Sequence, residues 1–375
     1  MTRWAGATTA REARSIGIDW VFAPDADLDI EPKNPIVQTR SFGADPAVAS
    51  RNVSLWVKGC QGEGALACAK HFPGHGRTTL DSHNVMPTVA TPFAELADTD
   101  LRPFAAAVNS GVASVMTAHV AYPAWDPSGA PATRSPTILG YLRRTLGFDG
   151  LVVTDAFIME GARAGATEGE AAVASLAAGC DILLYPGDLA GTLHELERAR
   201  EDGRLPAARV AEALRRYEAA LAKVGTAGPA APLPALTSGE VARRLIARGI
   251  RGERPDLSGG IELAVVDDDV GGWYAPGPSD YVARWLASHG VHEQYGGKRV
   301  VLAFAEPRAA KGRAGFGPES LERLARLSEG AALMVLFAHP RLAAELPGSC
   351  PVLVAWHRQR LMQESVAEWL AGKAR

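Results

Sequence analysis

Gly150-Leu-Val-Val-Thr-Asp155 is a run of apolar residues that follows a glycine and ends in a carboxylate. A short apolar run bounded in this way is typical of a buried strand. Similar runs occupy residues 17–23, 65–70, 112–118 and 181–184. The first 224 residues are therefore predicted to contain five short strands of this kind.

Helical patterns separate these strands along the chain. They occupy residues 46–60, 93–109, 137–146, 168–178 and 192–201, and a last one covers 206–224. Regular alternation of strand and helix, with a polar residue after each strand, predicts a parallel sheet that is either open or closed into a barrel. We expect residues 1–224 to form one α/β domain of this type.

Residues 225–236 are rich in proline, alanine and glycine, which is the composition of a linker. Residues 237–375 then alternate again, on a smaller scale. Strands are expected near 261–266, 300–305, 333–338 and 352–356, with helices near 278–289, 318–327 and 363–370. The second part is predicted to be a smaller α/β sandwich domain.

Composition excludes several classes of partner. The net charge of −3 over 375 residues gives no basic surface for a nucleic acid, and no apolar run is long enough to cross a bilayer. The four cysteines are scattered, without a CxxC pair, which favours a reducing compartment and a cytoplasmic location. We expect no cofactor.

The run Lys70-His-Phe-Pro-Gly-His-Gly76, followed by Asp81-Ser-His83, gathers three histidines and a carboxylate. Its glycines and proline argue against a helix face or a pleated strand, so the chain is expected to enter a loop directly after strand 65–70. Asp81 and His83 are two residues apart and project to the same side of an extended loop. The carboxylate then holds one imidazole nitrogen and leaves the other for proton transfer. The alternative is a polar surface loop with incidental histidines.

Three polar residues stand where strands end: His71, His119 and Asp155. The carboxyl ends of strands form the active site of a parallel α/β barrel. Asp155 alone could be a helix N-cap, and His119 alone is best explained as a hydrogen-bonded core histidine. Together with the loop, however, Asp155 and His83 supply a carboxylate nucleophile and a mobile acid/base, as retaining glycoside hydrolysis requires.

These segments resemble the glycoside hydrolase family 3 β-N-acetylglucosaminidases of the Asp–His dyad type. The dyad loop carries the most specific resemblance, and Val153-Thr-Asp-Ala-Phe-Ile-Met159 is similar to the family's nucleophile segment. Residues 22–27 and 39–43 are similar to its sugar-binding segments, and the resemblance runs from about residue 12 to 225.

The resemblance implies a TIM-type (β/α) barrel and removal of terminal β-N-acetylglucosamine from a carbohydrate substrate. By it, Asp155 is the nucleophile, His83 the acid/base and Asp81 its partner. The sugar hydroxyls would be held by three further side chains, and no metal is implied. These three are Arg40, Lys70 and His71.

One departure concerns the start of the chain. Family members carry an additional N-terminal portion with a sugar-binding segment, which this sequence lacks, and a closed barrel needs about eight strands. We therefore expect a barrel incomplete at its N-terminus, with open sheet edges and exposed apolar surface. Such a chain is expected to associate and to be a poor catalyst.

Alternatives remain open at this point. Because the acceptor would face a neutral imidazole instead of a carboxylate, phosphate could replace water, which would make the reaction a phosphorolysis. A truncated, inactive sugar-binding remnant is another possibility, and the aglycone and oligomeric state are left undetermined. A metal-dependent barrel hydrolase would draw its ligands from His71, His75, His83, His119 and Asp155.

Overall fold

The computed structural model describes residues 1–225, 240, 243, 253–269 and 274–373. The chain divides into two compact units, Met1–Leu233 and Pro234–Arg375, each described by itself. Apart from Gly225, the predicted linker at 225–236 lies outside the described residues.

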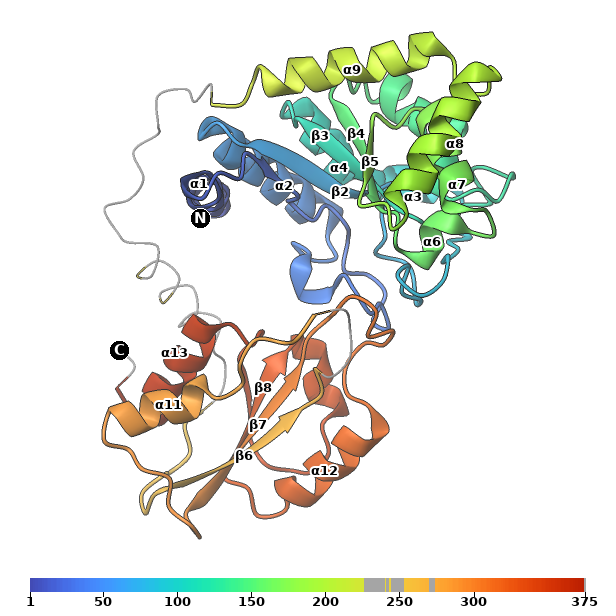
Figure 1. Ribbon diagram of the computed structural model, residues 1–375. Helices are drawn as coiled ribbons and strands as arrows, with labels where there is room; N and C mark the ends of the chain where they lie inside the picture. The colour runs from blue at the N-terminus through green and yellow to red at the C-terminus, as the bar shows by residue number, and fades with distance from the viewer. Residues whose placement is uncertain (226–239, 241–242, 244–252, 270–273, 374–375) are drawn as a thin grey trace. The chain divides into compact units, whose positions relative to one another are not determined.

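A five-stranded parallel sheet forms the centre of the first unit, in the order β1-β2-β3-β4-β5 (Figure 1). Each strand pairs with the next one along the chain, and helical segments connect these parallel neighbours. This is the topology of a (β/α) barrel. The strands are β1 (Trp20–Val21), β2 (Leu66–Phe72), β3 (Ser114–Thr117), β4 (Leu151–Ala156) and β5 (Ile182–Leu184). The expected fold class is confirmed, with five strands where a closed barrel has eight.

The helices of this unit agree with the predicted positions, with two differences. The pattern at 93–109 forms two helices, because the backbone of Thr99 departs from helical geometry, with φ −127° and ψ −82°. The next residue, Asp100, binds Arg77. The pattern at 137–146 ends in a π-turn. The helices are α1 (Thr2–Ser15), α2 (Pro46–Gly62), α3 (Phe93–Asp98), α4 (Leu101–Asn109), α5 (Pro136–Gly140), α6 (Glu160–Arg163), α7 (Glu168–Ala178), α8 (Leu189–Glu201) and α9 (Ala207–Leu221). Short helical turns add η1 (Gln38–Arg40), η2 (Ala132–Arg134) and η3 (Tyr141–Thr145).

Strand β2 is longer than the sequence suggested. The prediction that the strand ends at Lys70 is wrong, because His71 and Phe72 continue it. Two neighbours extend it: Asp25 forms a parallel bridge with Lys70, and Phe72 lies opposite Thr117 of β3. The chain turns away from the sheet only at Pro73.

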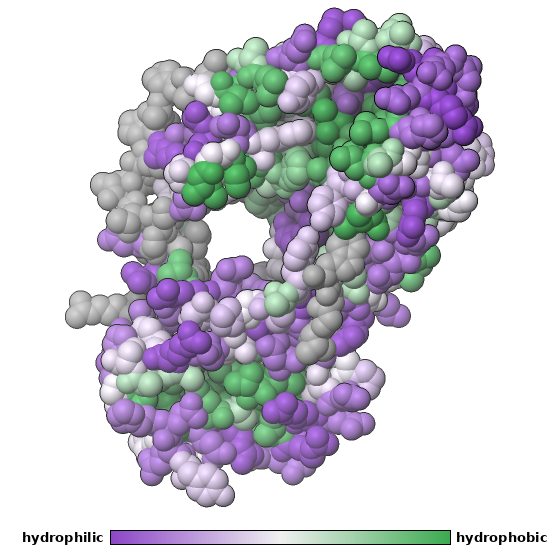
Figure 2. All heavy atoms as spheres, viewed as in Figure 1, coloured by the Kyte–Doolittle hydropathy of each residue, from purple (hydrophilic) through white to green (hydrophobic). Residues whose placement is uncertain are grey.

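Both edges of this sheet are open among the described residues, since β1 and β5 each pair with one neighbour. Apolar side chains are exposed on α9, where Leu214, Tyr217 and Leu221 lie on successive turns. Figure 2 shows hydrophobic patches on the surface of this unit. The expected association through these surfaces stays a prediction. No helix among the described residues is long and apolar enough to cross a membrane.

The second unit is a parallel four-stranded sheet in the order β6-β7-β8-β9. Separate apolar cores lie on its two faces, one under α11 and α13 and the other under α12, which makes it the expected α/β sandwich. Its elements are β6 (Ile261–Asp267), α11 (Tyr281–Ser288), β7 (Lys298–Ala305), α12 (Pro318–Ser328), β8 (Leu333–Ala338), η4 (Pro340–Glu345), β9 (Val352–Val354) and α13 (Arg360–Leu370).

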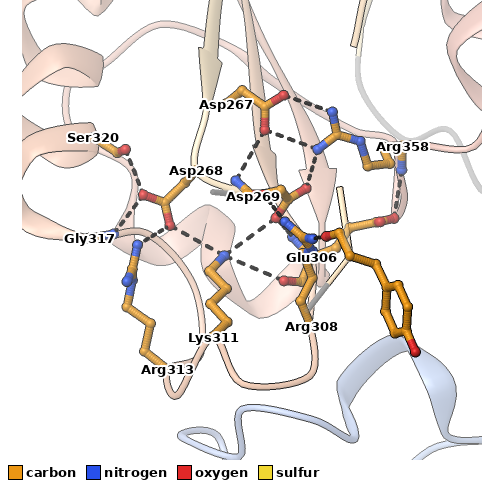
Figure 3. A network of polar contacts seen from close by, with 11 residues as sticks. Asp267, Asp268, Asp269, Glu306, Arg308, Lys311, Arg313, Gly317, Ser320 and Arg358 are labelled. Atoms are coloured by element: carbon orange, nitrogen blue, oxygen red, sulfur yellow. Dashed lines mark hydrogen bonds and ion pairs between the residues drawn. The ribbon is translucent and has the colours of Figure 1, made fainter. Parts of the chain in front are cut away.

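A network of charged side chains joins the carboxyl ends of these strands (Figure 3). Arg358, which follows β9, binds Asp267 at 2.7 Å and Asp269 at 2.6 Å, so that it connects β9 to β6. The ammonium of Lys311 is fully buried between Asp268 and Asp269, at 3.3 and 3.4 Å. Because every one of these charges has an opposite charge beside it, the network compensates much of the cost of burial.

We predict that replacing Arg358 with methionine destabilises the second unit by about 3–5 kcal/mol, because Asp267 loses its ion-pair partner and the buried Asp269 keeps only Lys311. The free energy of unfolding is measured in urea, with hydrogen exchange of peptides from β6–β9 as the probe of the second unit. The control is Arg360→Met, which removes an exposed pair with Glu364 and is expected to change stability by less than about 0.5 kcal/mol. Equal effects of the two substitutions would contradict the role of the network.

Candidate active site

Asp155 lies at the carboxyl end of β4, one residue before the strand ends. Its Oδ1 accepts a hydrogen bond from the Ala156 N–H at 2.8 Å, and its Oδ2 is 3.8 Å from Nε2 of His71. Burial by itself raises the pKa of this carboxyl, but His71, His119 and the Ala156 N–H outweigh it, and the pKa lies below its usual value. Asp155 is therefore an ionised carboxylate with a side chain that is 19% exposed.

Asp27 fixes the two histidines of β2 and the loop after it. Its carboxylate accepts hydrogen bonds from the His75 N–H at 2.6 Å and from Nδ1 of His71 at 2.7 Å. Since a carboxylate only accepts, Nδ1 of His71 carries the hydrogen, and Nε2 stays an acceptor on the side of Asp155. Burial lowers the pKa of His71 to about 4, so the ring is neutral at physiological pH.

Two cationic side chains, Arg40 and Lys70, lie near His71. Arg40 binds Oδ2 of the buried Asp25 at 3.1 Å and donates to the Ile36 carbonyl at 2.8 Å, which orients its guanidinium. Burial raises the pKa of Asp25 to about 6, even against the attraction of Arg40. Lys70 makes no side-chain hydrogen bond or ion pair with any residue that the structure describes, so its ammonium is available to a ligand.

The loop after β2 is held close to the rest of the site. A Cβ atom at Gly76 would lie 1.8 Å from the Leu28 carbonyl oxygen, so only glycine fits there. Tyr122 donates to the Gly74 carbonyl at 2.7 Å. Further along the loop, Asp81 and His83 meet as the sequence predicted, with Oδ1 of Asp81 2.6 Å from Nδ1 of His83.

The structure does not gather the ligands that a metal-dependent hydrolase was expected to use. Among the described residues, one group has potential ligand atoms within 4.8 Å of one another, and it consists of Asp25, Asp27 and His71. Of the five proposed ligands only His71 belongs to it. Arg40 already supplies a positive charge to Asp25, and Nδ1 of His71 already donates to Asp27, so a cation would displace existing contacts.

Residues 2–219 match the family model described as the glycosyl hydrolase family 3 N-terminal domain. This match covers more than half of the chain. The protein belongs to glycosyl hydrolase family 3. A solved family 3 β-N-acetylglucosaminidase from Paenibacillus sp. superposes with a TM-score of 0.85 at 27% identity, and the match covers 100% of this chain and 78% of that chain.

Two curated relatives of this family 3 protein extend the comparison. A β-hexosaminidase from Chromobacterium violaceum is 38% identical over 179 residues, which are 48% of this chain and 50% of the relative. A β-N-acetylglucosaminidase/β-glucosidase from Cellulomonas fimi is 34% identical over 233 residues, which are 60% of this chain and 41% of that protein. The chain thus spans about half the length of the curated relatives it matches.

The predicted site residues of this family 3 protein fall into two groups in space. Arg40, Lys70 and His71 surround the carboxyl ends of β2 and β4, together with Asp155. Asp81 and His83 form their dyad on the loop that follows. His119 is buried and bonds Thr133 through Nδ1 at 2.9 Å, as expected of a core histidine.

Sequence reasoning gave no individual role to Asp25 and Asp27 and named His75 only as a candidate metal ligand. The structure places all three in the hydrogen-bonded framework of the site. A signal was present for the two carboxylates, because residues 22–27 were recognised as similar to a sugar-binding segment. For His75 the signal was its place in the histidine-rich run, but nothing in the spacing shows that its ring bonds Thr78 and Ser82.

We predict that His75 makes the first unit sensitive to acid. Its Nδ1 lies 2.8 Å from Thr78 Oγ1 and its Nε2 lies 2.9 Å from Ser82 Oγ, and burial lowers the pKa of the ring to about 3. The unfolded chain takes up this proton near pH 6.5 and the folded chain does not, so stability is lost as pH falls. The loss amounts to about 2 kcal/mol between pH 7 and pH 5.

Thermal melts across this pH range are expected to show that the melting temperature of the His75→Gln variant changes less with pH than that of the wild type. His194→Gln, at an exposed position on α8, serves as the control and should leave the pH dependence unchanged. The titration of Asp25 has the opposite effect on stability, since its raised pKa favours the folded state as pH falls. This effect is the same in the wild type and in both variants, so it cancels in the comparison. An unchanged slope in His75→Gln would refute the prediction.

Proposed function

We propose that the protein is a retaining β-N-acetylglucosaminidase of the exo-acting type, with Asp155 as nucleophile and His83 as acid/base. The observation that carries the proposal is the ionised carboxylate of Asp155 at the end of β4, beside the neutral His71 of β2. The Asp81–His83 pair lies on the loop that follows β2. The two curated relatives, a β-hexosaminidase and a β-N-acetylglucosaminidase/β-glucosidase, support this choice of substrate. In this proposal the first unit is the catalytic domain.

In the first step a carboxylate oxygen of Asp155 attacks the anomeric carbon of the sugar. The bond from that carbon to the aglycone oxygen breaks, and the protonated imidazole of His83 donates its proton to the leaving oxygen. The product is a glycosyl ester on Asp155. Asp81 stabilises the imidazolium and keeps the ring oriented through the 2.6 Å contact with Nδ1.

In the second step His83 is neutral and accepts a proton from water, whose oxygen attacks the anomeric carbon from the opposite face. The ester bond breaks and Asp155 leaves as a carboxylate, which its low pKa favours. Two inversions at one carbon give a product with retained configuration. Both catalytic groups return to their starting protonation states.

Sugar hydroxyls are proposed to bind Arg40, Lys70 and His71. Arg40 and Lys70 only donate hydrogen bonds, whereas the neutral His71 ring offers an acceptor at Nε2. A hydroxyl group accepts and donates at the same time, so donors and an acceptor around one pocket suit a polyol. Asp25 and Asp27 act on the sugar only through Arg40 and His71, which they orient.

Incubation of the purified chain with an aryl N-acetyl-β-glucosaminide tests the proposal. The account expects release of the phenol and of β-configured N-acetylglucosamine, detected by NMR before mutarotation. The aryl β-glucoside should be a poorer substrate, and a chelator should have no effect. Loss of turnover with chelator would support the metal-dependent alternative instead, and α-configured product would overturn the retaining mechanism.

Phosphorolysis is a second candidate, because a neutral His83 would face the acceptor and Lys70 offers an unpaired ammonium to an anion. The same assay with rising phosphate concentration decides between the two. Appearance of N-acetylglucosamine 1-phosphate favours phosphorolysis, and free sugar at every concentration favours hydrolysis. Sugar binding without any turnover would support the inactive remnant.

A further inference from the structure

The short helix α6 begins directly behind the nucleophile segment and lacks a side-chain cap. The first N–H groups of any helix have no partner inside the helix and must find one outside it. Here the Glu160 N–H donates to the His83 carbonyl at 3.2 Å, and the Gly161 N–H donates to the Ser82 carbonyl at 3.0 Å. The loop that carries the Asp81–His83 dyad therefore caps the helix that follows Asp155.

Gly161 stands where three segments meet. A Cβ atom at this position would lie 2.9 Å from the Ser82 carbonyl oxygen and 3.0 Å from the His119 carbonyl oxygen. It would also lie 3.1 Å from the Cβ of His119. Two of these neighbours are backbone atoms, so an added methyl group forces the chain segments apart. The contact between the dyad loop and α6 thus depends on the missing side chain.

The dyad loop is fixed from its other side as well. Ser82 Oγ lies 2.9 Å from Nε2 of His75, and the His75 N–H is bound to the buried Asp27. The Ser82 backbone is therefore held between the framework of β2 and the N–H group of Gly161. Small displacements of α6 are transmitted directly to the residue next to His83.

From these contacts we propose that Glu160 and Gly161 are positioning residues for His83. In the conformation that the structure shows, their backbone N–H groups hold the acid/base loop on the segment that follows Asp155. The inference rests on the proposed function for its catalytic meaning, whereas the attachment of the loop is a property of the fold. The sequence predicted a mobile acid/base, and such movement of the loop would have to break the hydrogen bonds that the Ser82 and His83 carbonyls accept here.

Position 160 allows a matched pair of variants. Proline removes the N–H group, and it suits the first position of a helix, where the preceding Met159 already has φ −73° and ψ 137°. Glu160→Ala keeps the N–H group and removes the same side chain, including its exposed pair with Arg163. Any difference between Glu160→Pro and Glu160→Ala therefore reports on the N–H group.

Position 161 provides a second pair. Gly161→Ala introduces the methyl group at the three-way contact, whereas Gly62→Ala places one at the end of α2, where nothing lies within 4 Å. The two substitutions are chemically identical, so a difference between them reports on the space around residue 161. If Gly161→Ala fails to fold, the pair at position 160 still tests the proposal.

Hydrogen exchange of peptides that cover residues 80–86 measures whether the loop is held. We expect exchange about three- to tenfold faster in Glu160→Pro than in Glu160→Ala, as for the loss of one backbone hydrogen bond, and at least as large an effect in Gly161→Ala. Peptides of the second unit should be unchanged. Equal exchange within each pair would overturn the proposal, whether or not the protein turns over a substrate.

Turnover measures whether the attachment positions His83. We expect glycosides with poor leaving groups to lose about tenfold more activity than activated aryl glycosides in Glu160→Pro and Gly161→Ala, because only the former need the proton. The same loss for all leaving groups would overturn the positioning role. If the wild-type chain turns over no glycoside, the proposed function fails, while the exchange measurement still decides the attachment of the loop.

Discussion

Replacing Asp155 with alanine is expected to lower kcat by about 10³-fold or more, because the substitution removes the proposed nucleophile. The carboxylate is ionised and its Oδ2 is 3.8 Å from His71, so it is ready to attack without a prior proton transfer. Steady-state kinetics on an aryl N-acetyl-β-glucosaminide measure the loss.

Asp149→Ala is the matched control, since this exposed carboxylate lies just before the same strand. Its kcat should equal that of the wild type. Far-ultraviolet circular dichroism and thermal melts show whether both variants are folded. A folded Asp155→Ala protein with near-wild-type kcat would contradict the assignment of the nucleophile.

Replacing His83 with alanine is expected to produce a loss that depends on the leaving group. Glycosides with poor leaving groups should lose about 10²- to 10⁴-fold in rate, which is the usual contribution of a general acid. Activated aryl glycosides should lose much less in the first step, because their phenolate leaves without a proton. Rates measured against leaving-group pKa for the wild type and the variant show the difference in slope.

Asp81→Asn tests the other half of the dyad and is expected to lower activity less than His83→Ala. The amide keeps the shape of the side chain but no longer places a negative charge 2.6 Å from Nδ1 of His83. His194→Ala, which removes an exposed histidine on α8, is the control for both variants. Equal losses over all leaving groups in His83→Ala would mean that His83 only shapes the loop.

Much of the fold could be predicted from the apolar pattern, because strands such as Leu333–Ala338 are short continuous apolar runs and helices such as Pro318–Ser328 have one apolar face. The dyad could be predicted as well, since Asp81 and His83 are close in sequence and their contact is local. Errors arose where a distant residue decided the local structure. His71 and Phe72 continue β2, and Phe72 pairs there with Thr117 of β3, which lies 45 residues further along the chain.

The framework around the site could not be predicted, because its contacts join distant segments. Asp27 binds His71 and His75 across more than forty residues, and Gly161 binds Ser82 across 79 residues of the chain. Sequence patterns describe the faces of single elements and contain no information about which polar groups meet after folding. The roles of Asp27 and Gly161 follow only from the way in which the fold brings the carboxyl ends of β2 and β4 together.

Covalent trapping tests the central claim most directly. The chain is incubated with a fluorinated N-acetylglucosaminide whose glycosyl-enzyme forms faster than it breaks down, and the peptides are then analysed by mass spectrometry. The account predicts one added sugar per chain, on the peptide that contains Asp155, and no label in Asp155→Ala. A label on another residue, or turnover of natural substrate with no label anywhere, would contradict it.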